Sequence, residues 1–320
     1  MKIGLYDVDS HNFPNLPLMK ISAWHKARGD DVEFVLPLCR YDRIYVSKVF
    51  GDEYSNINNF CLQADEIFFG GTGFAIKVEN GREIYEKSRD KELPPEIEHI
   101  YPDYSLYPDL TKDTAYGFLT RGCPNNCPFC IVTEKEGRIS KKVADLSEFW
   151  SGQKQIKLLD ANLLACNGRR QLLQQLIDSK AKVDFTQGLD ARFINEETAA
   201  LLKNIKIERV HFAFDLMKNE AAIVRGLNIF KDVCGLTDNK TIVYVLTNYN
   251  TTIDEDLYRI KKIIECGYIP DVRIYRKPSA PKVLKDLQRW SNNRLIFRSC
   301  DFMDYRPRAD GKTIKELYFT

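Results

Sequence analysis

The chain of 320 residues lacks the sequence features that mark membrane-spanning, fibrous and disordered proteins. No stretch approaches the roughly 20 consecutive apolar residues that a membrane-spanning helix needs. There is no internal repeat and no low-complexity tract. Hydrophobic residues make up 44% and charged residues 29% of the chain, ordinary values for a globular protein with a substantial core. The composition therefore excludes collagen-like, coiled-coil and intrinsically disordered chains.

The sequence also lacks an excess of charge of either sign. The 47 lysines and arginines stand against 45 aspartates and glutamates, which leaves a net charge of +2. So close a balance does not indicate a nucleic acid or an anionic membrane as a partner. The first residues, MKIGLYDVDSHNF, do not follow the basic-then-apolar plan of a secretory signal, because Asp7 and Asp9 come almost at once. We therefore expect a cytoplasmic protein with no membrane partner.

Nine cysteines are present, and three of them are clustered. In a reducing compartment, thiols serve as ligands or catalysts more often than they form disulfides. Cys123, Cys127 and Cys130 lie in the run RGCPNNCPFC, with the spacing C-x3-C-x2-C. The other cysteines stand singly, at positions 39, 61, 166, 234, 266 and 300.

The N-terminal part of the chain alternates short apolar runs with polar or amphipathic stretches. Residues 2–7, 32–36, 44–46 and 66–69 are predicted strands, and a predicted helix from Leu18 to Gly29 separates the first two. This order indicates a small, doubly wound parallel sheet over residues 1–85. Residues 86–112 are polar, contain four prolines and show no sustained period, so they are predicted to be a linker.

A longer alternation follows the linker. The predicted strands are 115–120, 155–160, 182–187, 208–214, 241–247 and 271–275, and the predicted helices are 144–152, 168–179, 196–204, 218–232, 254–266 and 281–290. Six strand–helix pairs are too few for the eight-unit TIM barrel of about 250 residues. The predicted fold class is therefore α/β, with a partial (β/α)6 TIM-type barrel over residues 113–297. A small doubly wound, Rossmann-like domain precedes the barrel, and residues 298–320 form a C-terminal extension.

The cysteine cluster follows the first strand of this predicted barrel, at the end where barrel enzymes carry their chemistry. A 4Fe–4S cluster normally takes four thiolates, and no fourth cysteine lies nearby, so one iron would stay open to another ligand. The alternative, a structural zinc site, usually has four ligands in paired groups. None of the four histidines, at positions 11, 25, 99 and 211, lies within 20 residues of the loop. Cys123, Cys127 and Cys130 are therefore predicted to bind an iron–sulfur cluster.

Residues 116–130 resemble the cluster loop of radical S-adenosylmethionine (radical SAM) enzymes, and the resemblance extends over about residues 113–300. It implies that Phe129 packs over a 4Fe–4S cluster whose open iron binds the amino and carboxylate groups of SAM. In this family, one electron from the cluster cleaves SAM into methionine and a 5′-deoxyadenosyl radical, which abstracts hydrogen from the substrate. The chemistry also implies an electron donor of the flavodoxin or ferredoxin type.

The ends of the next three predicted strands carry candidate SAM-binding side chains. Asp160 and Asn162 stand where many family members have a glycine-rich segment, and they offer oxygens to the SAM ammonium or cap the following helix. Arg192 can clamp the SAM carboxylate, with Gln187 beside it, or lie on the surface at a helix start. Asp215 can bond ribose hydroxyls or the ammonium, or cap the next helix. His211, inside a strand, is expected to be a core residue.

The last predicted strands carry candidates for substrate contacts. They are Asn248, Tyr249 and Asn250 after the fifth strand, and Arg273, Tyr275 and Arg276 around the sixth. Arg289 and Arg294 follow in the last helical stretch. Their guanidinium groups suit a carboxylate or a phosphate.

The N-terminal domain resembles the cobalamin-binding domain that many radical SAM enzymes carry. Residues 9–14 partly match the D-x-H-x-x-G loop of that family, in which the histidine, here His11, ligates cobalt. Pro14 stands where glycine is expected. Residues 70–73, Gly-Gly-Thr-Gly, either cradle the cofactor's tail or form a tight turn. For this domain, the prediction favours a degenerate fold without cobalamin. For the whole chain, the predicted function is a radical SAM enzyme that abstracts hydrogen from an unidentified substrate. The alternatives to that function are a cobalamin-dependent radical SAM methyltransferase and a non-catalytic iron–sulfur or zinc protein.

Overall fold

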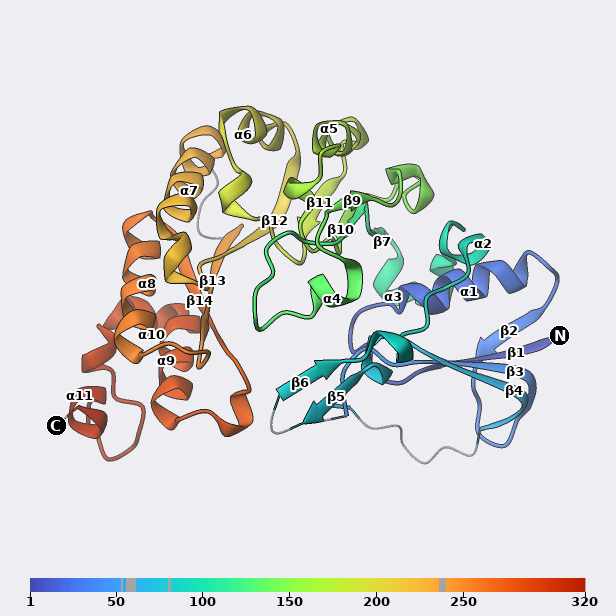
Figure 1. Cartoon of the computed structure of the whole chain (residues 1–320), viewed down its shortest axis with the longest axis horizontal. Coiled ribbons are helices and arrows are strands. Elements are labelled where there is room, and N and C mark those ends of the chain that lie inside the picture. The colour runs from blue at the N-terminus through green and yellow to red at the C-terminus, as the bar shows by residue number, and fades with distance from the viewer. Residues whose placement is uncertain (53, 56–61, 80–81, 236–239, 320) are drawn as a thin grey trace. The chain divides into compact units, whose positions relative to one another are not determined.

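The structure is a computed structural model, and it describes the whole chain except residues 53, 56–61, 80–81, 236–239 and 320 (Figure 1). Cys61 thus lies outside the described residues. The chain divides into two compact units. The first comprises Met1–Ala161 with Cys166–Gly168, and the second comprises Asn162–Ala165 with Arg169–Thr320. Each contains parallel sheet and helices, so the predicted α/β class is confirmed.

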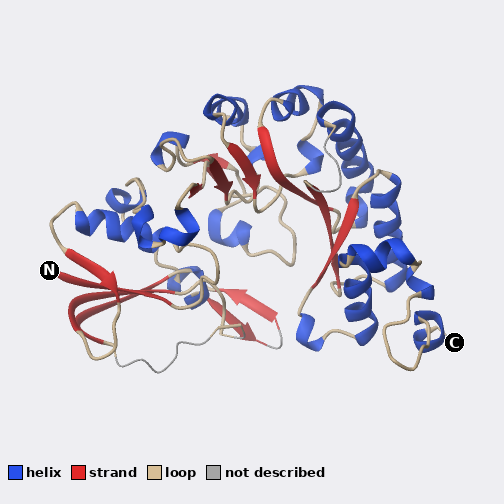
Figure 2. Ribbon diagram, turned by 180° about the vertical axis from the view of Figure 1, so that it is seen from behind, coloured by secondary structure: helices blue, strands red, loops and turns tan. Residues whose placement is uncertain are grey.

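The first unit begins with a four-stranded parallel sheet in the order β2-β1-β3-β4. Its strands are β1 (Lys2–Asp7), β2 (Asp31–Phe34), β3 (Arg40–Ser47) and β4 (Gln63–Gly70), close to the four predicted ones. Helix α1 (Leu16–Lys26) begins at Asn15, whose side chain accepts a hydrogen bond from the backbone of Leu18. Ile3 and Leu5 of β1 pack with Leu18 and Ile21 of α1 in one core cluster. Figure 2 shows α1 lying along this sheet.

The predicted linker is packed against the N-terminal sheet and α1. It contains two single-turn helices, α2 (Pro95–Glu98) and α3 (Pro108–Thr111). The Tyr107 hydroxyl donates to Asp7 at the end of β1, with an O···O distance of 2.6 Å. The Asp103 carboxylate accepts from Ser22 and Lys26 of α1. An antiparallel hairpin of β5 (Ile76–Glu79) and β6 (Arg82–Tyr85), which was not predicted, precedes this segment.

The strand predicted at 115–120 is interrupted in the structure. Strand β7 (Thr114–Gly117) pairs in parallel with β10 (Gln155–Leu158), whereas β8 (Thr120–Arg121) pairs antiparallel with β9 (Lys141–Lys142). The short helix α4 (Val132–Glu136) lies between β8 and β9 in the chain. The helix predicted at 144–152 is wrong, because only one 3-10 turn forms, at Leu146–Glu148. Gly152, at a φ of 114°, then turns the chain toward β10.

In the second unit, strands and helices alternate as predicted. The parallel strands β11 (Lys182–Phe185), β12 (Lys206–Ala213), β13 (Thr241–Thr247) and β14 (Ile269–Ile274) pair in this order. The helices are α5 (Arg169–Ser179), α6 (Glu196–Lys203), α7 (Glu220–Cys234), α8 (Ile253–Glu265) and α9 (Lys282–Asn292). In Figure 1, α6, α7 and α8 follow one another along the same side of these strands. Because these strands are parallel, their carboxyl ends share one edge of the sheet.

The C-terminal extension packs onto α9. Helix α10 (Arg294–Ser299) crosses the predicted start of this extension at residue 298, and α11 (Ile314–Tyr318) lies within it. The Phe302 ring packs at a tilt against Trp290 of α9, with 5.5 Å between the ring centroids, and Ile314 is fully buried. Among the residues that the structure describes, no helix combines the length and the apolar character needed to cross a bilayer.

Candidate functional site

The three predicted cysteine ligands lie on one loop that starts at the end of β8. Cys123 and Cys127 are half-buried and Cys130 is exposed. The backbone N–H of Cys130 donates to the carbonyl of Cys127 at 3.0 Å, and that of Cys123 donates to Gly137 at 3.1 Å. Asn126, at a φ of 42°, allows the chain to turn between the first two cysteines. The C-x3-C-x2-C segment therefore folds as a compact loop whose cysteines are half-buried or exposed.

Glu136, at the end of α4, ties the start of this loop to its end. One carboxylate oxygen accepts from the Arg121 guanidinium at 2.8 Å, and the other accepts from the backbone N–H of Gly122 at 3.0 Å. Gly122 has a φ of 93°, and a Cβ there would lie 2.2 Å from the carbonyl oxygen of Ile139. Only glycine fits this close approach. Glu136 was not predicted from the sequence, because it lies six residues beyond the last cysteine and belongs to no recognisable motif.

Asp160 holds the segment that leads into the cysteine loop. One carboxylate oxygen accepts from the backbone N–H and the hydroxyl of Thr120, and the other accepts from the N–H of Leu119 at 3.2 Å. The side chain is 4% exposed. Burial raises the pKa of this carboxyl to about 6, while the hydrogen bonds from Thr120 and Leu119 oppose the rise. Asp160 therefore fixes the chain three residues before Cys123, a role that was not predicted from the sequence.

Two of the predicted SAM-binding residues, Asn162 and Arg192, meet on one carboxylate in the second unit. The Asn162 amide donates to Asp190 at 3.0 Å, and its oxygen accepts from the backbone of Ala165. The Arg192 guanidinium binds both oxygens of Asp190, each at 2.8 Å. Such bidentate pairs fix the guanidinium plane. Asp190 therefore positions both residues, a role that was not predicted from the sequence.

Asp215 lies between the ends of β12 and β13. Its carboxylate accepts from the backbone N–H of Leu246 at 2.9 Å. Burial raises the pKa of Asp215, and the charges of Arg259 and Arg192 oppose the rise. Arg259 of α8 is fully buried and donates to the carbonyls of Phe214, Asp215 and Leu246 and to the Asp256 carboxylate. This single guanidinium joins α8 to two strand ends.

The remaining SAM-binding candidates are more exposed. Gln187 is exposed on the turn after β11, and Phe129 is half-buried between Cys127 and Cys130.

Among the candidates for substrate contacts, the Asn248 amide donates to the carbonyl of Tyr275 at 2.7 Å. The rings of Tyr249 and Tyr275 meet edge to face, with centroids 4.9 Å apart. The ends of β13 and β14 thus bring together the candidates that the sequence placed there.

His211 is a core residue, as predicted. It is 7% exposed, and its ring stacks on Tyr244 with centroids 4.9 Å apart. Its buried Nδ1 has no hydrogen-bond partner among the described residues. Burial, with the nearby charges of Arg209 and Arg273, lowers the pKa of this imidazole to about 4.

Acidification is expected to destabilise the protein through His211. Below pH 6.5 the unfolded chain binds a proton at this imidazole, whereas the folded chain does not until the pH nears 4. The free energy of unfolding therefore falls over this window. In His211→Phe, which keeps the stacked ring and removes the titrating group, that contribution is lost. Urea unfolding at pH 7.5 and at pH 4.5 checks this, because the variant should gain stability over the wild type at the lower pH. An equal difference at both pH values would contradict the prediction.

Asp9 and His11, the two side chains that match the partial cobalamin-binding motif, contact other residues of the chain. The Asp9 carboxylate accepts from the backbone N–H groups of Val49 and Phe50, at 2.7 and 2.9 Å. His11 is exposed and stacks on Phe50, with centroids 6.1 Å apart. A hollow of about 390 Å³ at the end of β1 includes both Asp9 and His11. Ligands bind at such strand ends in open α/β sheets.

The glycine run at the end of β4 makes room for the chain's own backbone. A Cβ on Gly71 would lie 2.4 Å from the Lys48 carbonyl oxygen, and one on Gly73 would lie 2.3 Å from that of Phe50. The N–H of Gly73 donates to Lys48 at 2.9 Å. These contacts favour the tight-turn interpretation of residues 70–73.

The donor set of the cysteine loop suits an iron–sulfur cluster. Thiolates are the soft ligands that such clusters take, and each cysteine binds a different iron. Within the part of the chain that the structure describes, no three His, Cys, Asp or Glu side chains are brought together as a metal-binding group. Cys123, Cys127 and Cys130 as ligands of an iron–sulfur cluster therefore stay a prediction from their spacing on one loop.

Comparisons with known proteins identify no family: no family model and no curated protein matches this chain.

Proposed function

We propose that this chain is a radical SAM enzyme whose 4Fe–4S cluster is held by Cys123, Cys127 and Cys130. When bound, the cluster supplies the electron that cleaves SAM reductively, and the resulting 5′-deoxyadenosyl radical abstracts hydrogen from a substrate. One observation carries the proposal. The three cysteines occupy a single loop, Asp160 holds the residues that lead into it, and Glu136, which follows it, accepts a hydrogen bond from Gly122 just before its first cysteine.

The fold supports this proposal in part. The alternation of parallel strands and helices from β11 to α9 is typical of a (β/α) barrel, and we propose a partial (β/α)6 TIM-type barrel over residues 113–297. The SAM-binding roles of Phe129, Asp160, Asn162, Gln187, Arg192 and Asp215 belong to the proposal. The proposal also includes an electron donor of the flavodoxin or ferredoxin type and a location in the cytoplasm.

For the N-terminal domain we propose a degenerate cobalamin-type fold without the cofactor. Asp9 is already used to hold residues 49 and 50, and the glycines of residues 70–73 accommodate backbone of this chain. A cobalamin-dependent methyltransferase remains the alternative, and the corrinoid's visible absorption in the purified protein would identify it.

The test is anaerobic reconstitution with iron and sulfide, followed by reduction with SAM present and an assay for 5′-deoxyadenosine. The variant replaces Cys123, Cys127 and Cys130 with alanine. The matched control replaces Cys39, Cys234 and Cys300, which are also half-buried but stand singly. We expect 5′-deoxyadenosine from the wild type and the control, and none from the cluster variant. Zinc alone in the loop, or 5′-deoxyadenosine that survives the triple substitution, would refute the proposal.

A further inference from the structure

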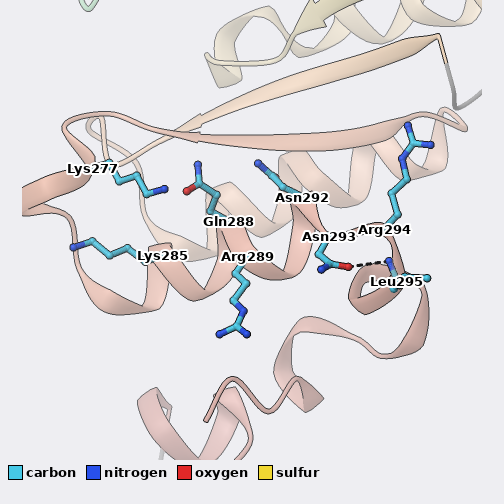
Figure 3. Close-up of a pocket in the computed structure, with 8 residues that line it drawn as sticks. All are labelled: Lys277, Lys285, Gln288, Arg289, Asn292, Asn293, Arg294 and Leu295. Atoms are coloured by element: carbon cyan, nitrogen blue, oxygen red, sulfur yellow. Dashed lines mark hydrogen bonds between the residues drawn. The ribbon is translucent and has the colours of Figure 1, made fainter. Parts of the chain in front are cut away.

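A positively charged groove lies along α9 in the second unit (Figure 3). Its volume is about 770 Å³. Four cationic side chains line it, Lys277, Lys285, Arg289 and Arg294, and none of its lining residues is acidic. The groove therefore suits a ligand with several negative charges.

The residues that form this groove belong to a segment with an excess of positive charge, although the net charge of the whole chain is close to zero. Between Val272 and Cys300 the sequence has eight lysines and arginines and only one acidic residue, Asp286. Asp286 is 8% exposed and accepts a hydrogen bond from the Tyr318 hydroxyl, so it faces away from solvent. Lys277, Lys285 and Arg289 form no ion pair with any residue that the structure describes. The positive charge on this face is therefore available to an outside partner.

The cations are spread along the groove. Lys285 and Arg289 are one helical turn apart on α9, a rise of about 6 Å. Lys277 lies on the turn after β14, before α9 begins, and Arg294 lies just beyond the end of α9. Figure 3 shows these side chains distributed along the helix, pointing in different directions. This arrangement fits an extended chain of negative charges better than one small anion.

The groove's floor is held rigidly against the edge strand β14. The Asn292 oxygen accepts from the N–H of Val272 at 2.7 Å, and its amide donates to the Val272 carbonyl at 3.1 Å. The Gln288 amide donates to the same carbonyl at 2.9 Å. On the opposite face of α9, Leu287 and Trp290 are buried. Lys285 and Arg289 thus lie on a helix that these contacts hold in place, so it does not need to rearrange to bind.

We propose that this groove binds the phosphodiester backbone of a single-stranded stretch of nucleic acid. A row of lysines and arginines with no carboxylate among them is the pattern that contacts successive phosphates. Lys277 stands at the carboxyl end of β14, next to Tyr275, which bonds Asn248. A strand in the groove therefore leads to the candidate substrate residues. The further step, which rests on the proposed function, is that the substrate is a nucleotide of that strand, unstacked for reaction.

The test measures binding of the full chain, without cluster or SAM, to fluorescently labelled single-stranded RNA and DNA of one sequence. Anisotropy is followed as salt rises from about 50 to 200 mM, because each phosphate contact contributes about 0.7 to the logarithmic salt slope. The groove variant combines Lys277→Gln, Lys285→Gln and Arg289→Gln. The matched control combines Lys203→Gln, Arg225→Gln and Lys261→Gln, three exposed cations on α6, α7 and α8.

In the groove variant we expect the salt slope to fall by about 2 and the affinity at low salt to fall at least about tenfold. The control should stay within about twofold of the wild type. Equal binding by the groove variant and the control would overturn the proposal. So would equally tight, groove-dependent binding of a polyglutamate, which would indicate an acidic protein partner. Because the assay needs neither cluster nor SAM, its failure leaves the proposed reaction standing, and absence of SAM cleavage leaves the binding result standing.

Discussion

Replacing Arg259 with methionine is expected to cost about 3–5 kcal/mol of unfolding free energy, a large part of the 5–15 kcal/mol that stabilises a typical domain. The guanidinium is fully buried and bonds three backbone carbonyls and the Asp256 carboxylate. Methionine fills similar space but donates nothing. The variant therefore leaves a buried carboxylate and several carbonyls without their donors.

Urea unfolding followed by circular dichroism measures this loss. Arg259→Lys should recover only part of it, because one ammonium cannot reproduce the planar fork that reaches both strand ends. Lys261→Met, an exposed position on the same helix, is the matched control and should stay within about 0.5 kcal/mol of the wild type. If Arg259→Met were as stable as Lys261→Met, the buried network would not be what joins α8 to β12 and β13.

Local sequence patterns predicted the strands and helices of the second unit well. Strand β13, TIVYVLT, is rich in β-branched residues and lies between polar turns, and its burial alternates along the strand. Its neighbours β12 and β14 are short strands that α7 and α8 separate from it in the chain. Such elements depend on nearby residues alone, so their existence can be predicted from one sequence.

The errors arose where contacts between distant residues decide the structure. Residues 144–152 have a helical pattern, but Asp145 and Glu148 close a capping box around one turn. Phe149 then lies against Gly117 of β7, where a Cβ would be 2.4 Å from the ring.

The candidate site shows the same division. The spacing of Cys123, Cys127 and Cys130 identified the loop, because chemistry constrains that spacing directly. The side chains that hold the loop could not be identified in this way. Asp160 bonds Thr120 from 40 residues away, and Glu136 bonds Gly122 from 14 residues away. No local pattern encodes such hydrogen bonds, which appear only once the fold brings the residues together.

Asp160→Ala is expected to loosen the cysteine loop and to reduce cluster loading. The substitution leaves the N–H groups of Leu119 and Thr120 buried without an acceptor, at a cost of about 1–3 kcal/mol each. The unpaired segment ends two residues before Gly122, so we expect faster amide hydrogen exchange over residues 118–140. After reconstitution, iron bound per chain should fall to less than about half that of the wild type, because the loop that carries the three thiols is no longer held in place.

Asp160→Asn separates the positioning role from a direct one. The asparagine oxygen can still accept from Thr120, but its NH₂ group faces the second donor, so exchange and loading should fall between those of the wild type and of Asp160→Ala. Asp178→Ala, at an exposed position on α5, is the matched control and should leave both measurements unchanged. Normal exchange and full loading in Asp160→Ala would show that the loop keeps its shape without this carboxylate. Asp160 would then be left with the SAM ammonium as its proposed partner, and a weaker SAM affinity with a normal cluster would be the expected signature of that role.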